Sequence, residues 1–311
     1  MADAFNGQRL TRKRVIMVKL ESTKGTKVDA DQAVYVENLT IRPTIPIIER
    51  NGAGRYLGYN HPHVFGESSG ECSFDVELKS NALNGCEAGL AIILQACGFV
   101  KSSEVYAMSS SPTDHKTISI DVYEDGKLKS LAGAMGNITI EAETGKRVML
   151  KCSFSGRWIA PTDAAIPSWS PSTAAPMRAQ SANFTIDSLS ARISRASLDM
   201  GNSVAPRWNP SESGGIEHYM ITDYAPKLSI DPEAELVANY NWFGKKAAGT
   251  TAAISQIFSD SAVDVTVTIP AAQIAEIETA DRDGVIVENV KYNLLHDSGN
   301  DAVSIKFSAS S

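Results

Sequence analysis

The chain has 311 residues, enough for two domains of ordinary size, and 43% of its residues are hydrophobic, as in globular proteins generally. The longest apolar run, Leu90–Leu94, is far too short to span a membrane, and the basic segment Met1–Arg14 is not followed by the apolar stretch of a signal peptide. The net charge is −7, and residues 181–311 carry 17 Asp and Glu against 9 Lys and Arg, which argues against binding nucleic acid by neutralising its phosphates.

The first half contains several segments in which apolar and polar residues alternate, the pattern of a strand with one wet face. Residues 50–70 separate two of these segments and hold five glycines, so they are expected to form a long functional loop. Asp125-Gly126 supplies the positive φ angles of a hairpin turn. The expected strands are 33–41, 72–79, 117–123, 136–141 and 147–154.

One helix is expected in this half, over residues 86–98. Its apolar residues recur at helical spacing, and Gly98 stands where a helix commonly ends. The spacing is carried by Cys86, Leu90, Ile93, Leu94 and Cys97.

All four cysteines, Cys72, Cys86, Cys97 and Cys152, lie in the first half, and no two of them form a C-x-x-C pair. We therefore expect buried thiols in a reducing compartment rather than disulfides or metal ligands.

The second half repeats the order of elements. A short helix is expected near 251–258, and Asp281–Gly284 is expected to form a turn. The expected strands are 183–198, 227–237, 263–269, 285–294 and 301–308.

Three pairs of segments suggest that the two halves are copies of one domain. Residues 34–41 resemble 184–189, Ser73–Leu78 resembles Ser229–Glu233, and Val148, Leu150 and Cys152 match Val303, Ile305 and Phe307, at offsets of 150, 156 and 155 residues. Between the halves, residues 159–181 are rich in Pro, Ala, Ser and Thr, typical of a linker. The expected domains are residues 1–158, with a basic N-terminal arm, and 182–311.

Motifs that suggest catalysis or metal binding are better explained as loops. Gly66–Gly70 fits G-x-S-x-G, but a hydrolase needs a helix after the serine and here a strand is expected. His61 and His63 have no further metal ligands at suitable spacing. No cofactor-binding motif is found, and we expect no enzyme activity.

Several segments resemble the tail tube proteins of long-tailed bacteriophages. The resemblance begins in Lys13–Thr26 and Glu37–Pro43, and it continues through Gly66–Leu78, the Gly89–Phe99 helix and Ser119–Ile140. Ser229–Glu233 and Ile269-Pro270 resemble a second tube domain, so that nearly the whole chain is covered.

The resemblance implies a mainly β fold of two tandem β-sandwich or half-barrel domains, each flanked by about one α-helix. It implies a structural virion protein that assembles with itself into stacked rings, which conduct viral DNA without specific binding. Two domains per chain imply a homotrimeric ring of pseudo-sixfold symmetry, with a homohexamer as the alternative. The other partners implied are the tape measure, terminator and baseplate proteins, with assembly in the bacterial host cytoplasm, a place in the virion tail, and no membrane.

A channel for DNA should carry carboxylates that repel phosphate. The candidates on alternating strands are Asp75, Glu77, Asp121, Glu141 and Asp264.

Two other functions stay open. A two-domain β-sandwich adhesin or binding module would show clustered exposed aromatic residues, yet Trp158, Trp169, Trp208 and Trp242 are dispersed. A hydrolase would have to use Ser68 or Ser69.

Overall fold

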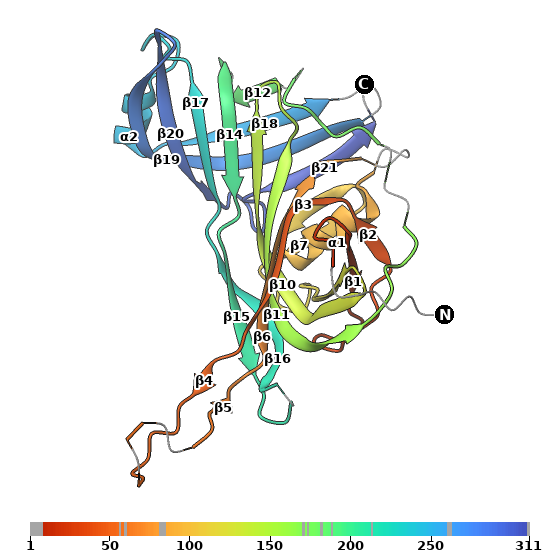
Figure 1. The fold of residues 1–311 in the computed structure, drawn as a ribbon. Coiled ribbons are helices and arrows are strands. Elements are labelled where there is room, and N and C mark those ends of the chain that lie inside the picture. The colour runs from red at the N-terminus through yellow and green to blue at the C-terminus, as the bar shows by residue number, and fades with distance from the viewer. Residues whose placement is uncertain are drawn as a thin grey trace.

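The computed structural model describes residues 9–55, 57–58, 61–80, 85–169, 172, 174–180, 183–187, 189–212, 214–259 and 263–309. This part of the chain is mainly β, with two helices, so the fold class expected from the sequence is confirmed (Figure 1). The part of the N-terminal arm before residue 9 lies outside the described residues.

The first half builds an antiparallel sheet around a hydrophobic core. Its strands are β1 (Arg14–Leu20), β2 (Gln32–Val34), β3 (Val36–Thr44), β6 (Ser69–Glu77), β9 (Ile118–Glu124), β10 (Lys127–Glu143) and β11 (Met149–Asp163). They pair in the order β2-β1-β9-β10-β11-β6-β3. Alternate residues face the core because successive side chains of a strand point to opposite faces; in β6 these are Cys72, Phe74 and Val76.

Helix α1 (Ala88–Ala96) covers this core and contacts β1, β2 and β10. Leu90, Ile93 and Leu94 form its buried stripe. The chain then turns at Gly98, whose φ of +90° suits glycine, into the hairpin of β7 (Phe99–Ser102) and β8 (Val105–Met108). The helix expected from the sequence is therefore confirmed.

Between β3 and β6 the chain forms a projecting hairpin, which we call the first arm (residues 45–68). Its short strands β4 (Ile47–Ile48) and β5 (Val64–Phe65) pair with each other. Figure 1 shows the first arm extending well beyond the rest of the molecule. The long loop expected at 50–70 is therefore partly a hairpin.

The second half builds a sheet with the same order of strands. Its strands pair in the order β13-β12-β18-β19-β20-β17-β14, so each has a counterpart in the first half. Their bounds are β12 (Asn183–Ile186), β13 (Leu189–Ser190), β14 (Ile193–Asp199), β17 (Lys227–Pro232), β18 (Thr251–Ser259), β19 (Val263–Arg282) and β20 (Val285–Leu295).

Helix α2 (Trp242–Ala248) packs on β19, and its N-terminus is capped by Asn241, whose side chain accepts from Gly244 N at 2.7 Å. The last strand, β21 (Ser304–Ala309), pairs with β19 and also with β8 of the first half.

A second arm (residues 200–226) connects β14 to β17, as the first arm connects β3 to β6. Its strands β15 (Asn202–Trp208) and β16 (Ile216–Tyr224) lie against β10 and β11 of the first half. Ile216, Tyr219 and Ile221 pack with Met135 there. A Cβ on Gly133, which has a φ of +60°, would lie 2.9 Å from His218 Cα, so this close approach requires glycine.

Several expectations for the second half were wrong. Residues 251–258 form strand β18, because Ala252, Ile254 and Phe258 are buried with the spacing of a strand, and the helix lies earlier, at α2. The strand expected at 183–198 is divided into three, with a turn at Asp187, whose φ is +52°. The strand expected at 227–237 ends at Pro232.

The segment matches read from the sequence fit the structure in part. Ser73–Leu78 and Ser229–Glu233 fall on the counterpart strands β6 and β17. The match of residues 148–152 to 303–307 is wrong, because the counterpart of β11 is β20 and the later segment is β21. Leu39 and Leu189 lie on strands that are not counterparts, and residues 159–163 of the expected linker belong to β11.

Candidate functional site

The two halves join where an edge strand of one sheet meets the long strand of the other. Strand β10 pairs with β9 over residues 127–134, and beyond this point its same edge pairs with β14 over residues 139–143. Main-chain hydrogen bonds from Met200 N to Ile138 O (3.1 Å) and from Thr144 N to Ser194 O (2.8 Å) extend the pairing at both ends. We call this pairing of β10 with β14 the internal joint.

The internal joint makes one continuous sheet out of both halves. Its strands lie in the order β3-β6-β11-β10-β14-β17-β20-β19, eight in all, and every neighbouring pair is antiparallel. At one end, β3 pairs within the described chain with β6 alone. At the other end, β18 pairs with β19 only as far as Gln273. Beyond Gln273, this edge of β19 has no strand partner among the described residues.

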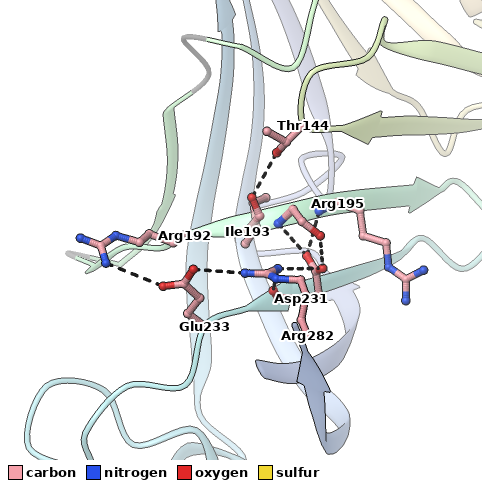
Figure 2. Close-up of polar contacts among 8 residues, drawn as sticks. Thr144, Arg192, Ile193, Arg195, Asp231, Glu233 and Arg282 are labelled. Carbon is pink, nitrogen blue, oxygen red and sulfur yellow. Dashed lines mark hydrogen bonds and ion pairs between the residues drawn. The ribbon is translucent and has the colours of Figure 1, made fainter. Parts of the chain in front are cut away.

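A cluster of polar contacts holds the internal joint from the side of the second half (Figure 2). Asp231 accepts hydrogen bonds from Ser194 N (2.9 Å) and Arg195 N (2.8 Å), where β14 bulges opposite it. Arg282, at the end of β19, lies 3.1 Å from the Asp231 carboxylate and 3.2 Å from that of Glu233. Figure 2 shows Arg282 reaching Asp231 and Glu233, while Thr144, just past the end of β10, donates to Ile193 O at 3.3 Å. A charged network of this kind fixes the position of the bulge.

A similar cluster stands at the corresponding place in the first half. Arg147 contacts the carboxylates of Glu37 and Glu77, and Lys79 lies 2.7 Å from Glu77. Burial by itself would raise the pKa of Glu77, but the hydrogen bonds and charges of Lys79 and Arg147 outweigh it and lower that pKa. Glu77 is therefore held ionised.

Three of the five candidate carboxylates lie on one face of the continuous sheet. Asp75 on β6 stands opposite Lys151 on β11. Met149, also on β11, has Glu77 of β6 opposite it on one side and Glu141 of β10 on the other. Lys151 lies 2.7 Å from Glu141. The sequence thus brings Asp75, Glu77 and Glu141 together, although each of them has a basic side chain close by.

Asp121 and Asp264 lie elsewhere. Asp121 is 1% exposed and accepts from Ala30 N (3.0 Å) and Ser130 Oγ (2.5 Å), so it serves the interior of the first half. Asp264 lies in the part of β19 that pairs with β18 and β21, outside the continuous sheet.

The face that carries Glu141 is hollowed at the internal joint. A groove there is lined by residues of both halves, among them Glu141, Arg195, Ser229 and Lys291. Lys291 lies 2.7 Å from Glu276, and this contact raises the pKa of the lysine. Lys151 and Lys291 are thus held close to carboxylates, whereas Arg195 makes no ion pair among the described residues.

The other residues considered from the sequence have structural roles. Ser68 Oγ donates to Trp158 O at 3.2 Å, Ser69 Oγ donates to Thr44 O, and a strand follows them where a hydrolase would need a helix. All four cysteines are buried and form no disulfide, as expected. The described residues contain no group of three or more His, Cys, Asp or Glu that could hold a metal ion, and neither of their helices is long and apolar enough to cross a membrane.

Sequence reasoning missed the residues that build the internal joint. Asp231, Arg282 and Thr144 are far apart along the chain, and strand pairing sets Arg282 beside Asp231 and Thr144 beside Ile193 of β14. The one available signal was the match of Asp75 with Asp231 in the repeat, which marked equivalent places without showing that one of them lies at a joint.

Comparison with protein families gives a model that spans nearly the whole chain. The model described as phage tail tube protein matches residues 11–309. No curated protein matches the chain. Because this match covers well over half of the sequence, the chain belongs to the phage tail tube protein family.

Proposed function

We propose that this chain is the structural subunit of a phage tail tube, which assembles with itself into stacked rings around a channel for DNA. The observation that supports this proposal best is the continuous sheet, each end of which has a strand edge without a partner strand among the described residues. Exposed strand edges invite pairing with another chain, and monomeric proteins usually protect them. A ring of identical chains would satisfy both edges at once.

The repeated order of strands supports a ring of three chains. If each half is one tube domain, the first ending with β11 and the second starting with β12, three chains provide a pseudo-sixfold ring. Eight strands from each chain would give about 24 strands, and at ~4.8 Å spacing their cylinder would be on the order of 37 Å across before strand tilt widens it. A hexamer, with one half in the wall and the other outside it, is the alternative.

The charges of the sheet suit a channel that does not retain DNA. Lys151, Arg147 and Lys291 are each held within 2.9 Å of a carboxylate, which reduces the positive charge that this face offers to phosphates. With Asp75, Glu77 and Glu141 on the same face, we propose that this face lines the channel. The role is structural and not catalytic, in the virion tail, with assembly in the host cytoplasm beside the tape measure, terminator and baseplate proteins.

Electron microscopy of the concentrated protein, together with its native mass, tests this proposal. Tubes or three-lobed rings, and a species of three times the chain mass of 33.3 kDa, are expected. Folded protein that stays monomeric at every concentration would contradict ring assembly and favour a binding module.

A further inference from the structure

We infer that neighbouring copies of the chain join through β3 and the C-terminal part of β19 in the register of the internal joint. The inference rests on the proposed ring and names its contact surface. The two halves correspond strand by strand, and this correspondence gives the contacts.

Strand β3 corresponds to β14. Each runs into an arm and pairs with the strand that follows the arm, β6 or β17. Each strand also has a bulge. Its core-facing side chains are three residues apart across the bulge and two residues apart after it. These side chains are Val36, Leu39 and Ile41 in β3, and Ile193, Ala196 and Leu198 in β14. Ile41 therefore corresponds to Leu198, and Thr40 to Ser197.

The end of β19 corresponds to the end of β10. Ile41 and Leu198 pair with Cys72 and Leu228, and these pair in turn with Phe154 and Tyr292, both buried aromatic residues.

Two residues before each aromatic residue, Cys152 and Val290 pair with Ile138 and Ile277. Ile138 therefore corresponds to Ile277, and Glu141 to Ala280.

The main-chain groups of β19 point in the required direction. Leu294 N donates to Pro226 O at 3.0 Å. The main-chain N–H and C=O groups of Leu294, Tyr292 and Val290, which alternate along β20, therefore point to β17. Because Val290 lies opposite Ile277, the main-chain groups of Ile277 and Thr279 point away from β20, to the unpaired edge.

The internal joint then gives the register between copies. It pairs Thr139 with Asp199, Ile140 with Leu198 and Glu141 with Ser197. The corresponding pairs between copies are Glu278 with Arg42, Thr279 with Ile41 and Ala280 with Thr40. The bond from Met200 N to Ile138 O has no counterpart, because Pro43 stands at the position of Met200 and has no N–H. Glu278 and Arg42 have opposite charges and both are exposed, and Arg42 also lies 2.6 Å from Glu71 of its own chain. The register thus places a cation opposite an anion across the joint.

The first arm fits the same arrangement. The second arm lies across the first half of its own chain, where Arg157 contacts Glu212 at 3.1 Å, and it also meets the base of the first arm, where Ser68 N donates to Gly214 O at 3.0 Å. By correspondence, the first arm would lie across the second half of the next copy. It carries apolar side chains that are exposed in the single chain, Ile47 at 58% and Phe65 at 70%. A neighbouring copy would cover them.

Disulfide crosslinking tests the register. Thr40→Cys and Ala280→Cys in one chain should form disulfides between copies on mild oxidation of assembled protein, because a directly opposite pair places the two Cβ atoms within reach. Denaturing gels should show covalent dimers and trimers, and nothing larger if the ring has three chains. Each single variant should stay a monomer on the gel, and the two single variants mixed before assembly should stop at dimers.

The matched control is Glu141→Cys with Ser197→Cys, the corresponding pair inside one chain, which should close within the monomer. Background oxidation should be low because the native cysteines are buried, and burial raises the pKa of Cys72 to about 12.

The outcomes separate this inference from the proposed function. If tubes form and the control closes, while Thr40→Cys with Ala280→Cys gives no covalent oligomer, the register is wrong and the tube function stands. If crosslinks form only with Thr40→Cys and Arg282→Cys, the proposed register is also wrong, and the tube function again stands. If no ring or tube forms even in the unmodified chain, the proposed function itself fails.

Discussion

At the scale of single residues, buried carboxylates organise places where segments distant in the sequence meet. Glu21 is 5% exposed and accepts four hydrogen bonds: from Gly25 N (2.8 Å), Thr117 Oγ1 (2.6 Å), Ser119 Oγ (2.8 Å) and Gly133 N (2.8 Å). Gly25 and Gly133 are also the residues against which the second arm packs. Glu21 therefore shapes the surface that receives this arm.

Replacing Glu21 by Ala should lower the free energy of unfolding by about 3 kcal/mol, because it leaves buried donors without an acceptor. Denaturant titration of the monomer measures this change. The control is Glu104→Ala, an exposed position in the turn between β7 and β8, which should change stability little. Equal effects of the two substitutions would show that the hydrogen bonds of Glu21 contribute nothing.

The pKa of Glu77 predicts how stability depends on pH. Its folded-state pKa is lowered by Lys79 and Arg147, so its ionised form stabilises the fold above the ordinary glutamate pKa of about 4.3. The contribution is lost as the pH falls through the lowered pKa. Glu77→Gln should therefore cost about 2 kcal/mol at neutral pH.

The difference between the parent and Glu77→Gln should shrink toward the most acidic pH at which both stay folded. Denaturant titrations across pH measure it. Glu71→Gln is the control, because the ion pair of Glu71 with Arg42 is exposed and should contribute under about 1 kcal/mol. A difference that did not change with pH would exclude an electrostatic role for Glu77.

At the scale of elements, the sequence predicted local structure better than strand pairing. The α1 helix was found because Leu90, Ile93 and Leu94 follow a helical period and Gly98 ends it. Strand β18 was mistaken for a helix because Ala, Ile and Gln are compatible with both structures over so short a segment. Its burial against β12 and β19 decided the matter.

Strand β19 offers a direct test of the assembly edge. Proline at Thr279 removes an N–H that points to the unpaired edge, so the monomer should fold and lose only the contact between its hydroxyl and Glu288 (2.8 Å). Ring formation should fall at least tenfold, because the ladder between copies loses a hydrogen bond and gains a steric conflict.

Proline at the adjacent residue, Glu278, is the control, since that N–H points to β20 and its loss should destabilise the monomer itself. Circular dichroism and microscopy separate the two effects. Normal tubes from Thr279→Pro would contradict the proposed use of this edge.

At the scale of the whole molecule, the net charge of −7 and the ion pairs of the sheet are consistent with the proposed channel wall, along which DNA would slide. Assembled tubes should therefore not retain duplex DNA at moderate ionic strength. Replacing both Asp75 and Glu141 by Lys should make the tubes bind DNA, with an affinity that falls steeply as salt increases.

Co-sedimentation of DNA with tubes, at several salt concentrations, measures this retention. The control carries Lys at Glu104 and Glu235, which are exposed but lie outside the continuous sheet. Equal retention by both variants would show that Asp75 and Glu141 do not face the channel.

The sequence by itself determined the mainly β class, the alternating strands, the α1 helix and the presence of two similar halves, because these depend on residues close together in the chain. The carboxylates Asp75, Glu77 and Glu141 were also visible as alternating residues of strands. Only the tertiary structure decided that β10 continues past β9 to pair with β14, that Asp121 is buried, and which strand edges stay open. Whether a strand edge is open depends on how all the other strands pair. Main-chain hydrogen bonds between segments far apart in the sequence determine that pairing.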